Sequence, residues 1–296
     1  MNLRFVEAFF WVATLKSVSR AADKLHLTQS AMSARVAALE EEVGALLLDR
    51  QDKQVRLTPA GTRFLHYAQK FLELQKELKA EMGATQSLAT TLRLGAIESV
   101  LHSWLIPWLE RLRIDQPGLE LELTVETTPM LMDQVQRGAQ DIVFAALPAA
   151  GEGVRHQVFP SLPMSFVGSA MLHRKRSYSL AELSGMELLT FQRGSQPYVA
   201  LVDVLRQAKL EGKRIHAISS VSAMVQLVQG GFGVATLPRA AAERLAQAQG
   251  LRLLKCDVAL PPLPIHASYR KDPTNSLFEA ILASALAFMP SKKSMG

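Results

Sequence analysis

Short polar side chains and one arginine cluster near the start of an expected helix, in a pattern that suits hydrogen bonding to DNA bases. Thr28 can accept a hydrogen bond from one of the first backbone N–H groups of a helix that begins at Gln29, so it predicts the helix start. Spacings of four and three predict an apolar stripe of Met32, Val36 and Leu39. The polar set lies off this stripe: Thr28, Gln29, Ser30, Ser33 and Arg35. Such a helix can enter the major groove and read base edges.

Two further helices would position the polar set. The first, over residues 3–15, has a broad apolar face and serves as scaffold. Ser17 or Ser19 can cap the second, in which Ala21 and Ala22 permit close approach to the Thr28 helix. A short turn joins these last two helices, which predicts a helix-turn-helix. Taken alone, this outline also fits ordinary helix packing.

A two-stranded wing is expected after the Thr28 helix, which ends at Gly44. An apolar run over residues 46–48 and a return over residues 55–57 flank a polar tip. The basic side chains available for phosphates or the minor groove are Arg50, Lys53 and Arg56, unless they are only solvated surface charges. We interpret Glu40, Glu41 and Glu42 as a solvated face.

Composition sets the class of protein. The chain has 296 residues, 48% of them hydrophobic and 20% charged, which predicts two or three globular units with ample core. A net charge of +6 favours a polyanionic partner, although acidic residues among the first sixty require the DNA-binding surface to be a local patch. Cys256 is the only cysteine, so the sequence excludes intrachain disulfides, Cys-rich zinc sites and a two-cysteine redox switch.

The N-terminus gives no sign of export. Arg4 and Glu7 interrupt any apolar core of a signal peptide, and no uncharged apolar run could span a membrane. We therefore expect a cytoplasmic protein with no membrane partner.

A long helix should follow the wing, because Thr58 and Pro59 form a favourable cap and first-turn pair. We expect it to reach about Gln86. Its apolar stripe is larger than one isolated helix can leave in water and predicts pairing with a second copy: Phe64, Tyr67, Phe71, Leu74 and Leu78. The alternative is that this helix packs only on its own winged helix.

Beyond residue 92, strands alternate with helices, which predicts parallel sheets covered by helices. Prolines near residues 163 and 264 mark two crossings of the chain, so we expect two α/β lobes similar to a periplasmic-binding-protein fold. The expected units are residues 1–58 (winged helix-turn-helix), 59–87 (linker helix), 88–91 (hinge) and 92–296 (two-lobed α/β domain). Within the two-lobed domain, lobe I covers about 92–162 and 266–296, and lobe II about 163–265.

Ligands of such sheets bind beyond the carboxyl ends of the strands, where loops and helix N-termini offer backbone donors. The candidate ligand-binding residues in lobe I are Glu98, Ser99, Val100, Thr128 and Ala146. Those in lobe II are Phe191, Ser195, Ser219 and Ser220. Each hydroxyl could equally cap only its own helix.

The N-terminal block resembles the signature of LysR-type transcriptional regulators in order and spacing. The matching residues are Ser19, Ala21, Ala22, Leu25, Thr28, Gln29, Ser33, Leu39, Glu40, Gly44, Leu47, Arg50, Leu57, Thr58 and Gly61. Two positions depart from it: Leu48 replaces the usual Phe, and Ala34 replaces a common basic residue, with Arg35 next.

The resemblance implies a winged-helix DNA-binding domain, a dimerising linker helix and an effector domain with the periplasmic-binding-protein fold. It implies promoter or operator DNA as a partner, self-association as a homodimer or homotetramer, and regulation by a small molecule bound between the lobes. Contact with RNA polymerase stays open. Positions matching Ser99 and Thr128 often touch effectors in relatives. Some relatives with anionic effectors have a basic residue near Ala146, and its absence here together with Glu98 argues against an anion.

An enzyme is the alternative of a different class. The sequence has no Walker loop, no Gly-x-Ser-x-Gly elbow and no His-Glu-x-x-His, and its histidines lack ligand spacing. We therefore expect no catalytic residue, no metal site and no cofactor other than the effector. A second alternative is a small-molecule-binding protein fused to an architectural DNA binder, which a gel shift with and without metabolites would distinguish from a regulator.

Overall fold

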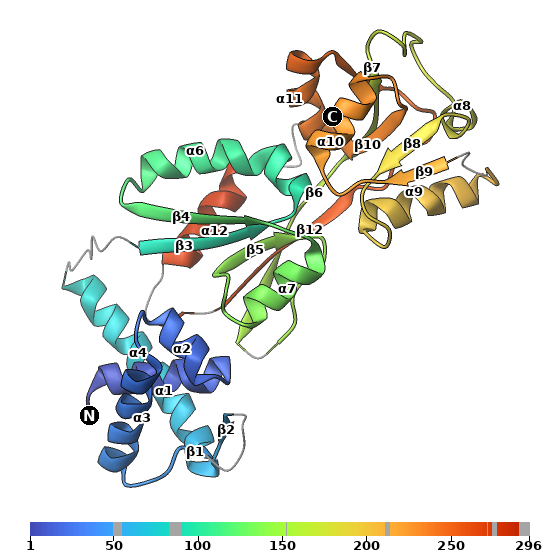
Figure 1. The fold of residues 1–296 in the computed structure, drawn as a ribbon. Coiled ribbons are helices and arrows are strands. Elements are labelled where there is room, and N and C mark those ends of the chain that lie inside the picture. The colour runs from blue at the N-terminus through green and yellow to red at the C-terminus, as the bar shows by residue number, and fades with distance from the viewer. Residues whose placement is uncertain are drawn as a thin grey trace.

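The computed structural model describes residues 1–49, 55–82, 90–151, 153–210, 214–270, 272–273 and 277–289. Figure 1 shows a helical N-terminal domain, a long helix and two α/β lobes in a row. This arrangement confirms the predicted fold class. No helix within the described ranges is long and apolar enough to cross a membrane.

The N-terminal domain is a winged helix. Its elements are α1(Leu3–Leu15), α2(Val18–Lys24), α3(Gln29–Val43), β1(Leu48–Asp49) and β2(Arg56–Leu57). Ser17, not Ser19, caps α2, and Thr28 caps α3 through the N–H of Ala31. Gly44 ends α3 in the left-handed conformation with φ of 70°, as its position predicted.

The linker helix α4(Pro59–Glu81) begins where the wing ends. The Thr58 hydroxyl accepts the N–H of Gly61 at 2.9 Å. A Cβ on Gly61 would lie 2.0 Å from the carbonyl oxygen of Leu47, so only glycine lets the helix start against the wing. The expected end of the helix and residues 88–89 of the expected hinge lie outside the described residues.

Lobe I has the strand order β4-β3-β5-β12-β6. Its strands are β3(Thr90–Ala96), β4(Leu119–Val125), β5(Ile142–Ala145), β6(Val154–Leu162) and β12(Leu263–Arg270). Its helices are α5(Glu98–Val100), the π-helical turn η1(Leu101–Leu105), α6(Ile106–Asp115), α7(Thr128–Gln136) and α12(Leu277–Phe288). Residues of η1, α6 and α12 share a core on one face of the sheet, and α7 packs on the other.

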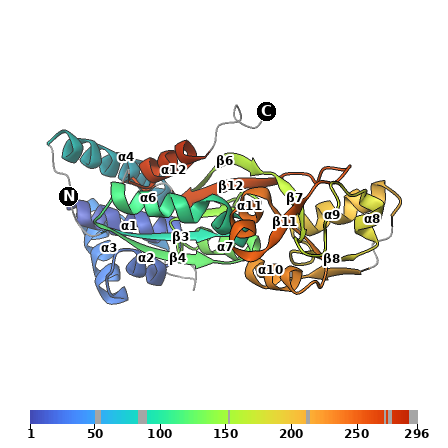
Figure 2. The same ribbon diagram turned by 90° about the horizontal axis from the view of Figure 1, so that it is seen from above.

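Lobe II has the strand order β11-β7-β10-β8-β9. Its strands are β7(Met164–Ser169), β8(Glu187–Thr190), β9(Arg214–Ala217), β10(Val234–Pro238) and β11(Leu251–Leu254). Its helices are α8(Leu180–Ser184), α9(Gln196–Gln207), α10(Val221–Gln229) and α11(Arg239–Gln249). Helices α10 and α11 contribute to a core on one face, and α8 and α9 to a core on the other. Viewed from above, the lobes lie end to end, joined through β6 and β12 (Figure 2).

The sheets differ from the expected parallel ones, because each is mixed. Strands β3, β4 and β5 are parallel, whereas β12 and β6 run antiparallel to their neighbours. The sequence did not predict β6, since Pro160 suggested an interruption. An edge strand tolerates proline, because one side of its backbone needs no donor, and β6 lies at the edge.

Candidate nucleic-acid interface and effector region

Helix α3 presents small polar groups to solvent at its N-terminal end. Gln29, Ser30 and Ser33 are exposed, while the predicted stripe of Met32, Val36 and Leu39 is buried in the winged-helix core. Thr28 is exposed too, and its hydroxyl lies 3.0 Å from that of Ser30. The Gln29 amide donates to the Ser19 hydroxyl at 3.2 Å, which fixes it at the corner between α2 and α3. The structure thus brings these four residues together.

Arg35 lies apart from them. A helix turns by 100° per residue, so Arg35 points about 200° away from Ser33. It is half-buried and close to Glu7 of α1. Burial raises the pKa of Glu7, Asp272 adds to the rise, and the positive charges nearby, including Arg35, oppose it. Arg35 therefore lies on a different side of α3 from the exposed polar face.

The wing is only partly described. In the β1–β2 pair, Asp49 is opposite Arg56, whose side chain is exposed. Arg50 and Lys53, predicted to contact phosphates, lie outside the described residues.

Glu40 corrects one interpretation of the sequence. It was expected on a solvated face, but it is only 5% exposed. One carboxylate oxygen accepts the N–H groups of Leu47 and Leu48 at 2.8 and 3.0 Å, so Glu40 joins α3 to the start of the wing. Glu41 and Glu42 are exposed as expected. The burial of Glu40 could have been predicted from the sequence, because Glu40 lies four residues after Val36 and therefore on the same buried side of α3.

The apolar stripe on α4 divides into two parts. Phe64 packs edge-on against Phe9 of α1, with ring centroids 5.4 Å apart, and belongs to the winged-helix core. The rest of the stripe faces solvent: Tyr67 is 57%, Phe71 39%, Leu74 63% and Leu78 58% exposed. Phe64 therefore does not contribute to the surface that these residues expose.

Candidate effector residues meet at the contact between lobes. A carboxylate oxygen of Glu98, at the start of α5, accepts the backbone N–H of Val221, the first residue of α10. The Ser220 hydroxyl caps the same helix through Ala223. In lobe I the Thr128 hydroxyl accepts the Ala146 N–H at 3.3 Å.

Other candidates are less available to a ligand. Val100 and Phe191 are 0% and 8% exposed and belong to the cores of lobe I and lobe II, so their side chains pack inward. Ser99 is 3% exposed. Ser195 caps α9 through the N–H of Tyr198. Ser219, in contrast, is exposed and therefore accessible to a ligand.

A second contact joins the lobes beside Glu98. Arg244 of α11 donates to the carbonyl oxygen of His102 in η1. Burial lowers the pKa of His102, Glu98 opposes the shift, and Arg244 adds to it. The lobes thus meet through a carboxylate at one helix N-terminus and a guanidinium at a backbone carbonyl.

The described residues contain no group of three or more His, Cys, Asp or Glu side chains that could hold a metal ion. The geometry defines a winged helix with an exposed recognition face, followed by a long helix and a two-lobed α/β module. This is the architecture of a DNA-binding regulator.

Comparison with known proteins identifies the family. Residues 85–289 match the family described as "LysR substrate binding domain", and residues 3–62 match "Bacterial regulatory helix-turn-helix protein, lysR family". The chain belongs to the LysR family of transcriptional regulators. It is a DNA-binding regulator with an effector-binding domain and is not an enzyme.

Relatives match along most of the chain. It is 32% identical to the probable hydrogen peroxide-inducible genes activator of Mycobacterium avium over 242 residues, 80% of this chain and 77% of the relative. Full-length ArgP from Mycobacterium tuberculosis has a similar fold, with a TM-score of 0.60, 21% identity and 96% of both chains covered. A full-length OxyR variant from Pseudomonas aeruginosa gives a TM-score of 0.59 at 24% identity, covering 96% of this chain and 99% of that one.

Proposed function

We propose that this regulator reads operator DNA with Thr28, Gln29, Ser30 and Ser33 in the major groove, while Arg35, Arg56, Arg50 and Lys53 contact the phosphates. The observation that supports this most is the exposure of amide and hydroxyl groups at the N-terminal end of α3, opposite its buried stripe. Hydroxyl and amide side chains can both donate to and accept from base edges. Arg35 lies on a different side of α3 from these groups, so we assign it a contact with the DNA backbone and not with base edges.

Binding to a duplex enriched from a random pool tests this division. Gln29→Ala and Ser33→Ala should each weaken binding to the enriched duplex by about 1–3 kcal/mol and change binding to a scrambled duplex much less. Arg35→Ala should weaken both by similar factors and reduce the salt dependence. Equal losses on both duplexes for Gln29→Ala and Ser33→Ala would contradict base reading by α3.

The exposed stripe on α4 supports self-association as a homodimer. Tyr67, Phe71, Leu74 and Leu78 recur at spacings of four, three and four and remain exposed in a single chain. Pairing two such stripes would remove them from water and place two winged helices on one DNA. A homotetramer would need further contacts between effector domains.

The effector that this arrangement supports is neutral or cationic. Glu98 already places a carboxylate at the N-terminus of α10, where an anionic ligand would otherwise find backbone donors. A carboxylate effector would either displace Glu98 or lie beside a like charge, at a cost of about 1 kcal/mol or more for two charges 4 Å apart. We place the effector between the lobes, beside Glu98, Ser99, Thr128, Ser219 and Ser220.

A thermal-shift screen of metabolites on the full chain tests the effector class, because a ligand of the native state raises its melting temperature. Amines and uncharged polar compounds should include the hits for the native protein. Glu98→Gln should lose the amine hits and gain carboxylates, while Glu122→Gln, an exposed carboxylate on β4, should change neither. Carboxylates that stabilise the native protein as well as they stabilise Glu98→Gln would contradict the assignment.

One relative is named as a probable activator of hydrogen peroxide-inducible genes, but Cys256 is the only cysteine in this sequence. Burial raises the pKa of its thiol, which reduces the reactive thiolate. We therefore favour a reversibly bound ligand over oxidation as the signal, and the cytoplasm as the compartment in which the regulator meets DNA.

A further inference from the structure

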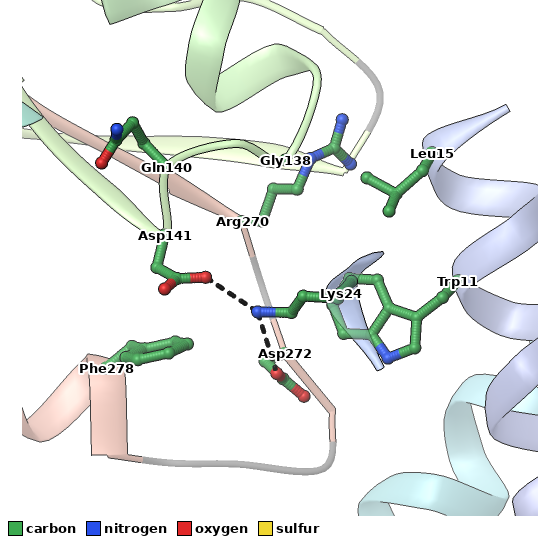
Figure 3. Close-up of a pocket in the computed structure, with 9 residues that line it drawn as sticks. All are labelled: Trp11, Leu15, Lys24, Gly138, Gln140, Asp141, Arg270, Asp272 and Phe278. Carbon is green, nitrogen blue, oxygen red and sulfur yellow. Dashed lines mark hydrogen bonds and ion pairs between the residues drawn. The ribbon is translucent and has the colours of Figure 1, made fainter. Parts of the chain in front are cut away.

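Lys24, the last residue of α2, lies in a buried contact between the winged helix and lobe I (Figure 3). Its Nζ atom is 2.8 Å from an oxygen of Asp141 and 4.0 Å from one of Asp272. The three side chains are only 15%, 4% and 9% exposed. The ammonium also lies 5.2 Å from the ring centroid of Trp11 in α1 and 5.3 Å from that of Phe278 in α12. A lysine enclosed in this way is part of an interface and is not a solvated surface charge.

Asp141 is shared between the two domains. One of its oxygens accepts the backbone N–H of Arg93 at 3.0 Å, and the Arg93 guanidinium donates to both oxygens. Burial alone would raise the pKa of Asp141, but Lys24 and Arg93 outweigh it and hold the pKa below its ordinary value. The carboxylate is therefore ionised and binds lobe I and the winged helix at once.

Two glycines allow the backbone of lobe I to approach α1 closely. A Cβ on Gly138, at φ of +74°, would lie 2.7 Å from a methyl group of Leu15. A Cβ on Gly153, also at +74°, would lie 3.1 Å from the methyl group of Thr14. The close packing of these glycines against α1 and the buried Lys24–Asp141 ion pair are two independent observations of one contact between the winged helix and lobe I.

We infer that lobe I carries a docking surface for the winged helix of its own chain, centred on Asp141 and Gly138, so that recognition helix and lobe I move as one body. Gln29, Ser30 and Ser33 remain exposed in the docked arrangement, which leaves the domain able to bind DNA. The linker helix is then not the only connection between the domains. A change in the angle between the lobes moves lobe II relative to a unit that contains α3.

Hydrogen exchange on the full chain tests the docking across the domain boundary. Gly138→Asn introduces a residue that tolerates positive φ, but it adds a Cβ atom that would collide with Leu15. Its matched control is Gly250→Asn, at φ of +63° with nothing within 4 Å of the added Cβ. Gly138→Asn should speed exchange in α2 several-fold and leave the more distant β10 unchanged, whereas Gly250→Asn should leave α2 unchanged. From the other side, Lys24→Met should speed exchange at residues 138–142, and Lys70→Met, at an exposed lysine on α4, should not.

Zero-length carbodiimide cross-linking of the native protein identifies the partner. Lys24 should couple to Asp141 or Asp272, and the exposed pair Lys175 and Glu182, 2.5 Å apart, serves as the reagent control. Mixing ¹⁵N-labelled and unlabelled protein should give only products within one chain. The docking is overturned if exchange in α2 is the same in Gly138→Asn and the native protein, or if the Lys175 product forms without a Lys24 product. Products between chains would overturn the assignment to the same chain.

Discussion

Truncating Leu74 should weaken self-association without unfolding the winged helix. Leu74 is 63% exposed, and full burial of a leucine side chain contributes about 1.5–3 kcal/mol, so pairing gains about 1–2 kcal/mol from each copy. Leu74→Ala should therefore cost a dimer about 2–4 kcal/mol, which raises its dissociation constant roughly 30- to 1,000-fold.

Leu72 on the same helix provides the contrast. It is 1% exposed and belongs to the winged-helix core, so Leu72→Ala should cost about 2–5 kcal/mol of folding free energy. Analytical ultracentrifugation measures the dissociation constant, and thermal melting measures the stability. The reasoning is refuted if Leu74→Ala leaves the dissociation constant unchanged, or if Leu72→Ala, studied where it is folded, weakens the dimer equally.

Further substitutions test individual groups. Glu40→Gln should lower the free energy of unfolding by about 1.5–3 kcal/mol in denaturant melts, because it removes a charged acceptor from two buried N–H groups, while the exposed Glu41→Gln should have little effect. Glu7→Gln should raise the free energy of unfolding at pH 7, because the raised pKa of Glu7 shows that the fold disfavours its charged form. The gain should vanish as the pH falls toward 4.5, the ordinary pKa of glutamate, where the native side chain becomes protonated. A gain that persists at pH 4 would mean that packing, not charge, is responsible. The pKa of Asp141 is lowered, so its charged form stabilises the fold and Asp141→Asn should lower the free energy of unfolding at pH 7. This loss should disappear below about pH 3.8, where the native carboxylate becomes protonated.

Local chemistry predicted much of the architecture. Thr28, Thr58 and Gly44 each mark a helix end where the structure has one, because capping depends on residues within a turn of the end. Alternation of strands and helices, together with the prolines near residues 163 and 264, predicted two α/β lobes. The antiparallel β6 was missed because pairing with β12, about one hundred residues away in the sequence, overrides the local effect of Pro160.

The site was predicted less completely, since helix periodicity alone cannot say what lies beside a face. Glu40 has the sequence context of a solvated acid, but the wing folds over it. Lys24 looks like any surface lysine until Asp141, 117 residues later, is placed against it. Arg35 and Ser33 are close in sequence and on different sides of α3. Val100 follows two polar candidates but points into the core.

The most direct test of the central claim is the affinity of the full chain for its enriched duplex, measured with and without a ligand found by thermal shift. The ligand should change the dissociation constant by about 5- to 150-fold, the usual range of coupling between two sites. Ser219→Trp should abolish this change while preserving affinity without ligand, because Ser219 is exposed and tolerates the larger side chain better than the buried Ser99 would. If the ligand binds the native protein but leaves its affinity for the duplex unchanged, the effector does not control DNA binding and the account is contradicted.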